Sequence, residues 1–197
     1  MSITFHCISG CNHCCMARGY LVEHKDMGVH GLPLQPHEIH RIRKLLRKHK
    51  VKGSIIPAYG TSEKDGDYPT IVIAYQLLSN DEEGNNCPFL SDGVKEPRHC
   101  IIYGDRPLSC KAYPLKPYNG KYNGYTIDEN CKWVGSKIPI FAKGAIRNLD
   151  YQAVYTLGVE NNYIPERHIM WFHATGISKS GDPPAKYGWY RISIWLV

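Results

Sequence analysis

Four cysteines lie within nine residues near the amino terminus, in the segment CISGCNHCC at 7–15, and the last two are adjacent. Cysteines serve as disulfide partners, as small core residues, or as thiolate ligands to a metal. Four more follow later in the chain. The complete set is Cys7, Cys11, Cys14, Cys15, Cys87, Cys100, Cys110 and Cys131. Which use applies depends on the compartment and on the surroundings of each thiol.

The expected compartment is reducing. The first residues lack a basic segment followed by an apolar stretch, and no apolar run approaches the length of a membrane span. We therefore expect a cytoplasmic protein without membrane contact. Clustered cysteines there more often bind metal than form disulfides. A bridge between Cys14 and Cys15 is also disfavoured, because neighbouring residues rarely reach the required dihedral without strain.

The local sequence around each cysteine also favours metal ligation over core packing. The first four share a loop with Gly10, Cys87 precedes a proline, and Cys100 opens a short apolar segment. Cys110 follows a turn that begins with a proline, and Cys131 ends an expected hairpin. Loops and strand ends can bring thiolates to one point, whereas core cysteines more often lie within a helix or strand.

These motifs resemble a known family. FHCISGCNHCC is similar to the opening signature of the YkgJ-type cysteine-cluster proteins, which are zinc- or iron-chelating domains related to flagellin lysine-N-methylases. The segment CPFLSDGVKEPRHCIIYGDRPLSCKAYP resembles the second block of the family, and CKWVG its last cysteine. The resemblance covers residues 5 to about 137 and implies that all eight cysteines are ligands. The first spacer is one residue longer than is usual, and Lys132 and Trp133 replace a Pro-Gly pair.

Thiolates select zinc, copper(I) and iron–sulfur clusters. Two adjacent cysteines are more easily accommodated as ligands when their sulfurs bind different metal ions or different irons of a cluster. This favours an iron–sulfur cluster and leaves zinc as the alternative. Arg106, between a short apolar segment and Cys110, is positioned in sequence to neutralise charge from several thiolates. An ion pair with Asp105 is the other use of this arginine.

The patterns predict an α+β fold with short elements. A helix is expected over 36–50, where Pro36 suits the first turn and apolar residues recur at helical spacing. Strands are expected from about Thr70, at CIIY (100–103) and at the end of the chain, with a hairpin near 118–131. Asp105 is expected to cap a short helix, and another helix is expected over 139–158. We assign 1–137 to a cysteine-cluster domain and 138–197 to an aromatic-rich extension packed on it.

The chain has a net charge of +6, and many of its cations lie on the predicted helix, from Arg41 to Lys52. This face could dock on RNA, a ribonucleoprotein or another protein, or it could be a solvated helix face. No phosphate-binding or dinucleotide-binding motif is present. The first functional hypothesis is therefore a metal-binding protein whose centre supports a redox or group-transfer reaction, such as the protein lysine methylation that the resemblance suggests. The alternative is a non-enzymatic module that docks on RNA through residues 36–52.

Overall fold

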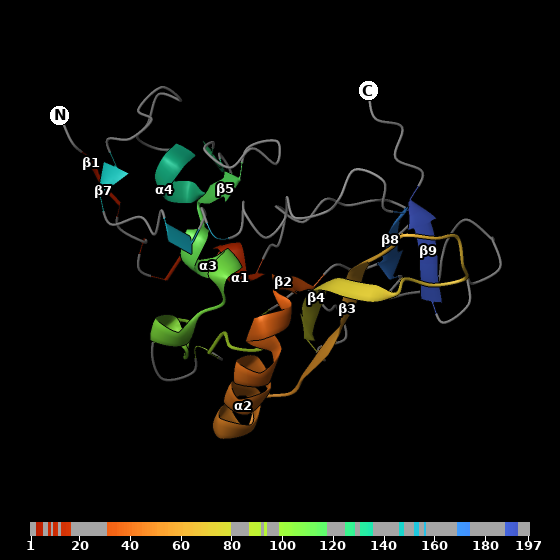
Figure 1. Cartoon of the computed structure of the whole chain (residues 1–197). Coiled ribbons are helices and arrows are strands. Elements are labelled where there is room, and N and C mark those ends of the chain that lie inside the picture. Colours follow the sequence, from red (N-terminus) through yellow and green to blue (C-terminus); the bar gives the residue numbers. More distant parts are fainter. Residues whose placement is uncertain are drawn as a thin grey trace. The chain divides into compact units, whose positions relative to one another are not determined.

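The computed structural model describes residues 3–5, 8, 10–11, 13–16, 31–79, 87–91, 93, 99–117, 125–128, 131–135, 146–147, 152–153, 156, 169–173 and 188–192. The chain divides into two compact units, whose elements are labelled in Figure 1. Unit 1 comprises Met1–Tyr20 and Phe89–Tyr163, and unit 2 comprises Leu21–Pro88 and Ile164–Val197. Helices and mainly antiparallel strands confirm the α+β class. The domain boundary after residue 137 stays a prediction.

Unit 2 is built on a five-stranded sheet with the order β2-β4-β3-β8-β9, in which every neighbouring pair is antiparallel. The strands are β2 (Leu32–Leu34), β3 (Gly53–Ser62), β4 (Ile71–Ser79), β8 (Ile169–His173) and β9 (Trp189–Ile192). The strand predicted from about Thr70 is therefore confirmed, and part of the predicted closing strand forms β9. The long β3–β4 pairing carries register shifts on both sides of Tyr59.

The predicted helix over 36–50 is confirmed as a 3-10 turn, η1 (Pro36–Glu38), followed by α2 (Ile39–His49). The Glu38 carboxylate is buried and accepts hydrogen bonds from the backbone N–H of Gln35 (3.1 Å) and from Arg41 (2.9 Å). These bonds satisfy a donor that the start of a helix leaves open. Lys50 ends α2 in a left-handed conformation, with φ 54°.

The core of unit 2 joins this helix to the sheet. Three apolar residues of α2 are buried, namely Ile42, Leu45 and Leu46, and so are Leu32, Leu34 and Leu77 on β2 and β4. Buried polar groups are paired: the Trp171 indole donates to the Ser62 hydroxyl (2.8 Å), and the Gln76 side chain accepts from the backbone N–H of Gly31 (2.7 Å). Unit 2 thus has a hydrophobic core with internally satisfied hydrogen bonds.

The described elements of unit 1 are much shorter. Strand β1 (Ile3–Thr4) pairs in parallel with β7 (Ile146–Arg147), and β5 (Leu115–Pro117) pairs antiparallel with β6 (Tyr125–Ile127). The helices are α1 (His13–Met16), η2 (Tyr103–Asp105), α3 (Leu108–Ala112) and α4 (Lys132–Gly135). The β5–β6 pairing agrees with the predicted hairpin, whose two Asn-Gly turns lie outside the described residues.

Three sequence predictions in unit 1 are corrected by the structure. Ile146 and Arg147 form a strand and not part of a helix over 139–158, because β1 offers them a non-local partner. Most of that range lies outside the described residues, and within it residues 152–153 and 156 are helical as predicted. In CIIY only Cys100 pairs as a strand residue, with Leu90, and a turn follows. The short helix near Asp105 begins later, at Leu108, with Pro107 as its cap.

Candidate metal centre

The structure describes seven of the eight cysteines, six of them in unit 1 and one in unit 2. Cys11, Cys14, Cys15, Cys100, Cys110 and Cys131 belong to unit 1, whereas Cys87 belongs to unit 2, one residue before its first segment ends. Cys7 lies outside the described residues. None of the seven described cysteines forms a disulfide. Their thiols therefore have the chemical state that metal ligation needs.

The amino-terminal cysteines are arranged by one short helix. The backbone N–H of Cys11 donates to the Ile8 carbonyl (3.0 Å), which closes the turn before α1. Cys14 and Cys15 then follow on α1, and their Sγ atoms lie 4.0 Å apart. Neighbouring side chains on a helix normally diverge, so this close approach brings two thiols to one place.

Cys14 is the most acidic thiol for which the structure indicates a shift. A hydrogen bond from Cys15 lowers the pKa of Cys14 to about 7, aided by the charge of Arg106 and a backbone N–H, while burial opposes the change. About half of this side chain is therefore thiolate at neutral pH. Since the thiolate is the form that binds metal, Cys14 is prepared to bind at physiological pH.

Cys100 is held by a short antiparallel pairing of 89–91 with 99–101. The backbone N–H of Ile101 donates to the Phe89 carbonyl (3.0 Å), and that of Ser91 to the His99 carbonyl (2.9 Å). Burial raises the pKa of Cys100, and the Cys14 thiolate raises it further, while Arg106 lowers it. The thiolates of Cys14 and Cys100 thus repel each other as like charges, and a bound cation would reduce this repulsion.

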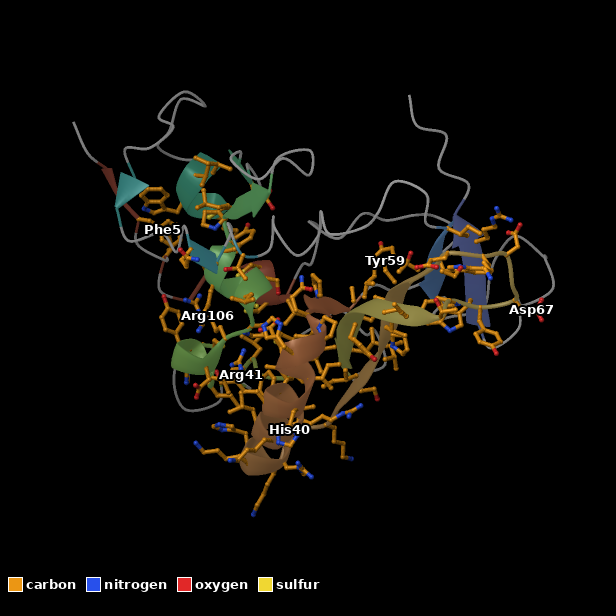
Figure 2. The ribbon with its side chains drawn as sticks, in the orientation of Figure 1. Phe5, His40, Arg41, Tyr59, Asp67 and Arg106 are labelled. Atoms are coloured by element: carbon orange, nitrogen blue, oxygen red, sulfur yellow. The ribbon has the colours of Figure 1, made fainter. Side chains whose placement is uncertain are left out.

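Arg106 lies between these thiols and α3. Its guanidinium lies over the Tyr103 ring, 3.9 Å from the centroid, and its Nε donates to the Tyr103 carbonyl at 2.9 Å. Its Nη1 is 3.5 Å from the carbonyl oxygen of Cys110. Figure 2 shows Arg106 beside the η2 and α3 segment. The arginine is fixed where its charge acts on both Cys14 and Cys100, which is the placement that charge neutralisation requires.

Two residues beside Cys131 were not singled out from the sequence. Burial raises the pKa of Tyr113 well above its ordinary value, and the charge of Asp128 and a hydrogen bond to Cys131 act in the same direction. Tyr113 therefore stays protonated and donates to the Cys131 sulfur. Asp128 is buried, and its carbonyl accepts from the backbone N–H of Cys131 (3.1 Å). The spacing Asp128-x-x-Cys131 and the Tyr-Pro pair at 113–114 are the sequence signals that could have indicated them.

The structure therefore brings some of the predicted residues together and leaves others apart. Cys14 interacts directly with Cys15 and through its charge with Cys100, Arg106 and Tyr113. Within the described part of the chain, however, no three His, Cys, Asp or Glu side chains are grouped closely enough to hold a metal ion. The structure brings the sulfurs of Cys14 and Cys15 close together, and the assignment of all eight cysteines as ligands stays a prediction.

The described residues include no helix that is both long enough and apolar enough to cross a membrane. Among family models, one described as "CxxCxxCC: Putative zinc- or iron-chelating domain" matches residues 6–132. This range contains all eight cysteines, from Cys7 to Cys131. No curated protein and no solved structure matches the chain.

Proposed function

Because the chain belongs to the CxxCxxCC family of zinc- or iron-chelating domains, we propose that it binds a thiolate-ligated metal centre nucleated by Cys14 and Cys15. One observation carries the proposal: the two sulfurs lie 4.0 Å apart, and the pKa of Cys14 is lowered to about 7. The pair can thus bind a cation with little cost for removing a proton from Cys14. Further thiolates would come from the same unit, with Arg106 offsetting part of their charge.

The form of the centre is the finer part of the proposal. An iron–sulfur cluster is the first form proposed, because such clusters take all-cysteine ligation from loops, and the eight thiols would suffice for two four-thiolate centres. In a [4Fe–4S] cluster each of the four cysteine sulfurs binds a different iron, and several loops can contribute ligands. The hydrogen bond from Tyr113 to Cys131 suits such a centre, since hydrogen bonds to the ligating sulfurs tune its reduction potential.

Zinc is the second candidate, and one distance favours it. A tetrahedral ion with metal–sulfur bonds of about 2.3 Å holds its sulfurs about 3.8 Å apart. The 4.0 Å between the Cys14 and Cys15 sulfurs is close to this value, so both could bind one ion. This distance weighs against the sequence-based argument that adjacent sulfurs reach different metals. A single iron ion with four thiolate ligands would have the same geometry.

Protein purified without oxygen and analysed for iron, sulfide and zinc tests these forms. A cluster gives a brown protein with iron and sulfide in similar amounts, and a zinc site gives a colourless protein with stoichiometric zinc. Cys14→Ala and Cys15→Ala should each lose most of the metal. Ser109→Ala, which changes α3 beside Cys110 without removing a thiol, is the matched control and should keep it. Full metal content in both cysteine variants would refute the assignment.

A redox or group-transfer reaction is proposed only for the cluster form. Protein lysine methylation rests on the resemblance to the flagellin lysine-N-methylases, and no residue of the described chain is assigned to a methyl-donor site. The test supplies the anaerobically purified protein with a sulfonium methyl donor and asks whether the mass of lysine-containing protein substrates rises by one methyl group. Metal-depleted protein is the control, and an equal mass change with both preparations would count against the centre as the catalyst.

A further inference from the structure

The excess positive charge of the protein is concentrated in one segment. Residues 27–62 contain seven Lys and Arg against a single carboxylate, Glu38, which gives +6. The whole chain also has +6, so the remaining 17 cations and 17 anions balance. Glu38 is buried and bound to Arg41, so it does not offset the other cations of the segment at the surface. This segment therefore presents a concentrated positive charge to a partner.

Four of these cations share the outer face of α2. Arg43, Lys44, Arg47 and Lys48 are exposed, and none forms an ion pair within the part of the chain that the structure describes. At 3.6 residues per turn they span an arc of about 140°. Ile42, Leu45 and Leu46 occupy the opposite arc and are buried. Figure 2 shows nitrogen-tipped side chains directed outward from α2, with His40 labelled among them. We name these four residues the α2 basic face.

The apolar side of α2 is already used, and this argues against a membrane as the partner. A helix that lies in a lipid surface inserts its apolar residues among the acyl chains. The side chain of Ile42 is fully buried, and Leu45 and Leu46 are less than one-tenth exposed. Only charged and polar groups remain to meet a partner, so binding at this face is electrostatic.

An acidic protein surface is also a poorer match. Interfaces between proteins depend on buried aromatic or apolar anchors, and the α2 basic face has none. Four carboxylates placed as densely as these four cations would repel one another on a helix. Phosphates of a nucleic acid, by contrast, carry one charge per nucleotide along a continuous backbone. The chemistry of the face therefore suits a polyphosphate chain.

We propose that the α2 basic face binds the phosphodiester backbone of single-stranded RNA. Both ends of α2 continue directly into other elements, η1 on one side and, through Lys50–Lys52, β3 on the other. The helix therefore presents its side and not a free end, which limits insertion into the groove of a duplex. A flexible single strand can instead lay its backbone along the helix. Residues four apart, such as Arg43 and Arg47, are about 6 Å apart along the axis, which allows contacts with successive phosphates.

The salt dependence gives the expected magnitude. Four phosphate contacts on a single strand predict a slope of about −2.8 in log affinity against log salt. Raising the salt from 50 to 200 mM should thus weaken binding by roughly 50-fold. Replacing Arg43 and Arg47 by Gln removes two contacts and should reduce the slope to about −1.4. Gln keeps a high helix propensity, so α2 should still form.

The test measures fluorescence anisotropy of a labelled, unstructured RNA with the purified full-length protein in its metal-bound form. The variants are R43Q/R47Q and the quadruple R43Q/K44Q/R47Q/K48Q. The matched control is K64Q/R191Q, which removes two cations from the other end of unit 2. Arg191 pairs with Asp65 there, and β3 separates that end from α2 by about 30 Å. Figure 2 labels Asp67 at that end. Metal content and melting temperature are measured for every variant.

The proposal is supported if the quadruple variant no longer binds RNA, the salt slope of R43Q/R47Q is half that of the wild type, and K64Q/R191Q binds as the wild type does. Absence of RNA binding at 50 mM salt overturns it, and so does equal loss in the control variant. Tighter binding to duplex DNA, or to vesicles of anionic lipid, than to RNA of equal charge concentration also overturns it. If the quadruple variant does not fold, the test rests on the salt slope of R43Q/R47Q, provided that its melting temperature is unchanged. The metal centre can be intact in either result, so this test is independent of the proposed function.

Discussion

Removing the thiol of Cys15 should make Cys14 less acidic in the metal-free, reduced protein. The hydrogen bond from Cys15 is the largest contribution that lowers the pKa of Cys14 to about 7, and burial acts against it. In Cys15→Ala only the burial and the weaker effects of Arg106 and a backbone N–H remain. The pKa of Cys14 should therefore return to near its ordinary value of 9.0.

This change has opposite effects on reactivity at low and high pH. At pH 7 the thiolate fraction of Cys14 falls from about one half to about 1%. The more basic thiolate is about tenfold more nucleophilic, since nucleophilicity follows pKa with a coefficient near 0.5. Thiol–disulfide exchange at Cys14 should thus be about fivefold slower in the variant at pH 7 and about fivefold faster at pH 9. The two rate profiles should cross near pH 8.

The assay follows exchange with a small neutral disulfide under chelator and without oxygen, and quantifies modified Cys14 by mass spectrometry. Arg106→Gln is the discriminating second variant. The charge of Arg106 lowers the pKa of both Cys14 and Cys100, so Arg106→Gln should slow disulfide exchange at both thiols at pH 7. Cys15→Ala should slow exchange at Cys14 alone. Parallel profiles for wild type and Cys15→Ala, without a crossing, would refute the role given to the Cys15 hydrogen bond.

The same shift links stability to pH. The pKa of Cys14 is lower in the folded chain, so its contribution is fully present above pH 9 and is lost as the pH falls through 7. The difference in free energy of unfolding between wild type and Cys15→Ala should therefore grow from pH 7 to pH 9, by roughly 2 kcal/mol. Chemical denaturation at several pH values measures it, and a difference that shrinks over this range would contradict the assignment.

Substitutions at three positions of unit 2, namely Lys50, Gly60 and Ser62, test its backbone conformation and packing. Lys50→Gly should raise the free energy of unfolding by about 0.5 kcal/mol, because it relieves a left-handed conformation, whereas Lys50→Val should lower it. Gly60→Ala should lower it by roughly 1–3 kcal/mol, since a Cβ there would lie 2.5 Å from the Pro69 ring. Ser62→Ala should cost about 1–3 kcal/mol by leaving the Trp171 indole without its acceptor, and clearly less when combined with Trp171→Phe. Urea denaturation measures all three, and unchanged midpoints would contradict these contacts.

The parts of the fold that local sequence determines could be predicted. The helix at 36–50 has its proline, its capping glutamate and its apolar spacing within one short segment. Strand β3 was missed because Pro57 and Gly60 interrupt the strand pattern, and its register shifts at Tyr59 remove the alternation. Strand β7 depends on a partner more than a hundred residues away, which no local pattern reveals.

The candidate site divides in the same way. The identities of the cysteines followed from their spacing and from the family resemblance. The 4.0 Å approach of Cys14 to Cys15 could not be predicted, because it depends on the side-chain conformations within α1. The contact of Tyr113 with Cys131 joins two separate cysteine motifs, and no local pattern indicates that they meet. Spacing therefore predicts the candidate ligands, while the interactions that shift their pKa values require the structure.

The two units differ in the length of the elements that stabilise each of them. This difference argues that the proposed metal centre would also stabilise the fold of unit 1. In the described part of unit 1 the longest helix has five residues and the longest strands have three. Helices and hairpins of this length are not stable by themselves. Unit 2 has an 11-residue helix on a five-stranded sheet with a buried core.

Seven of the eight cysteines belong to unit 1, whose described elements are the shorter ones. Thiolate–metal bonds can supply this missing stability, since zinc binding contributes roughly 10–16 kcal/mol to the folding of small zinc domains. Chelation should therefore expose unit 1 amides, such as those of Cys110 and Cys131, to hydrogen exchange, while β3 and β4 stay protected. Equal protection of both units after complete metal removal would mean that unit 1 folds without its centre, and that the cysteines serve chemistry alone.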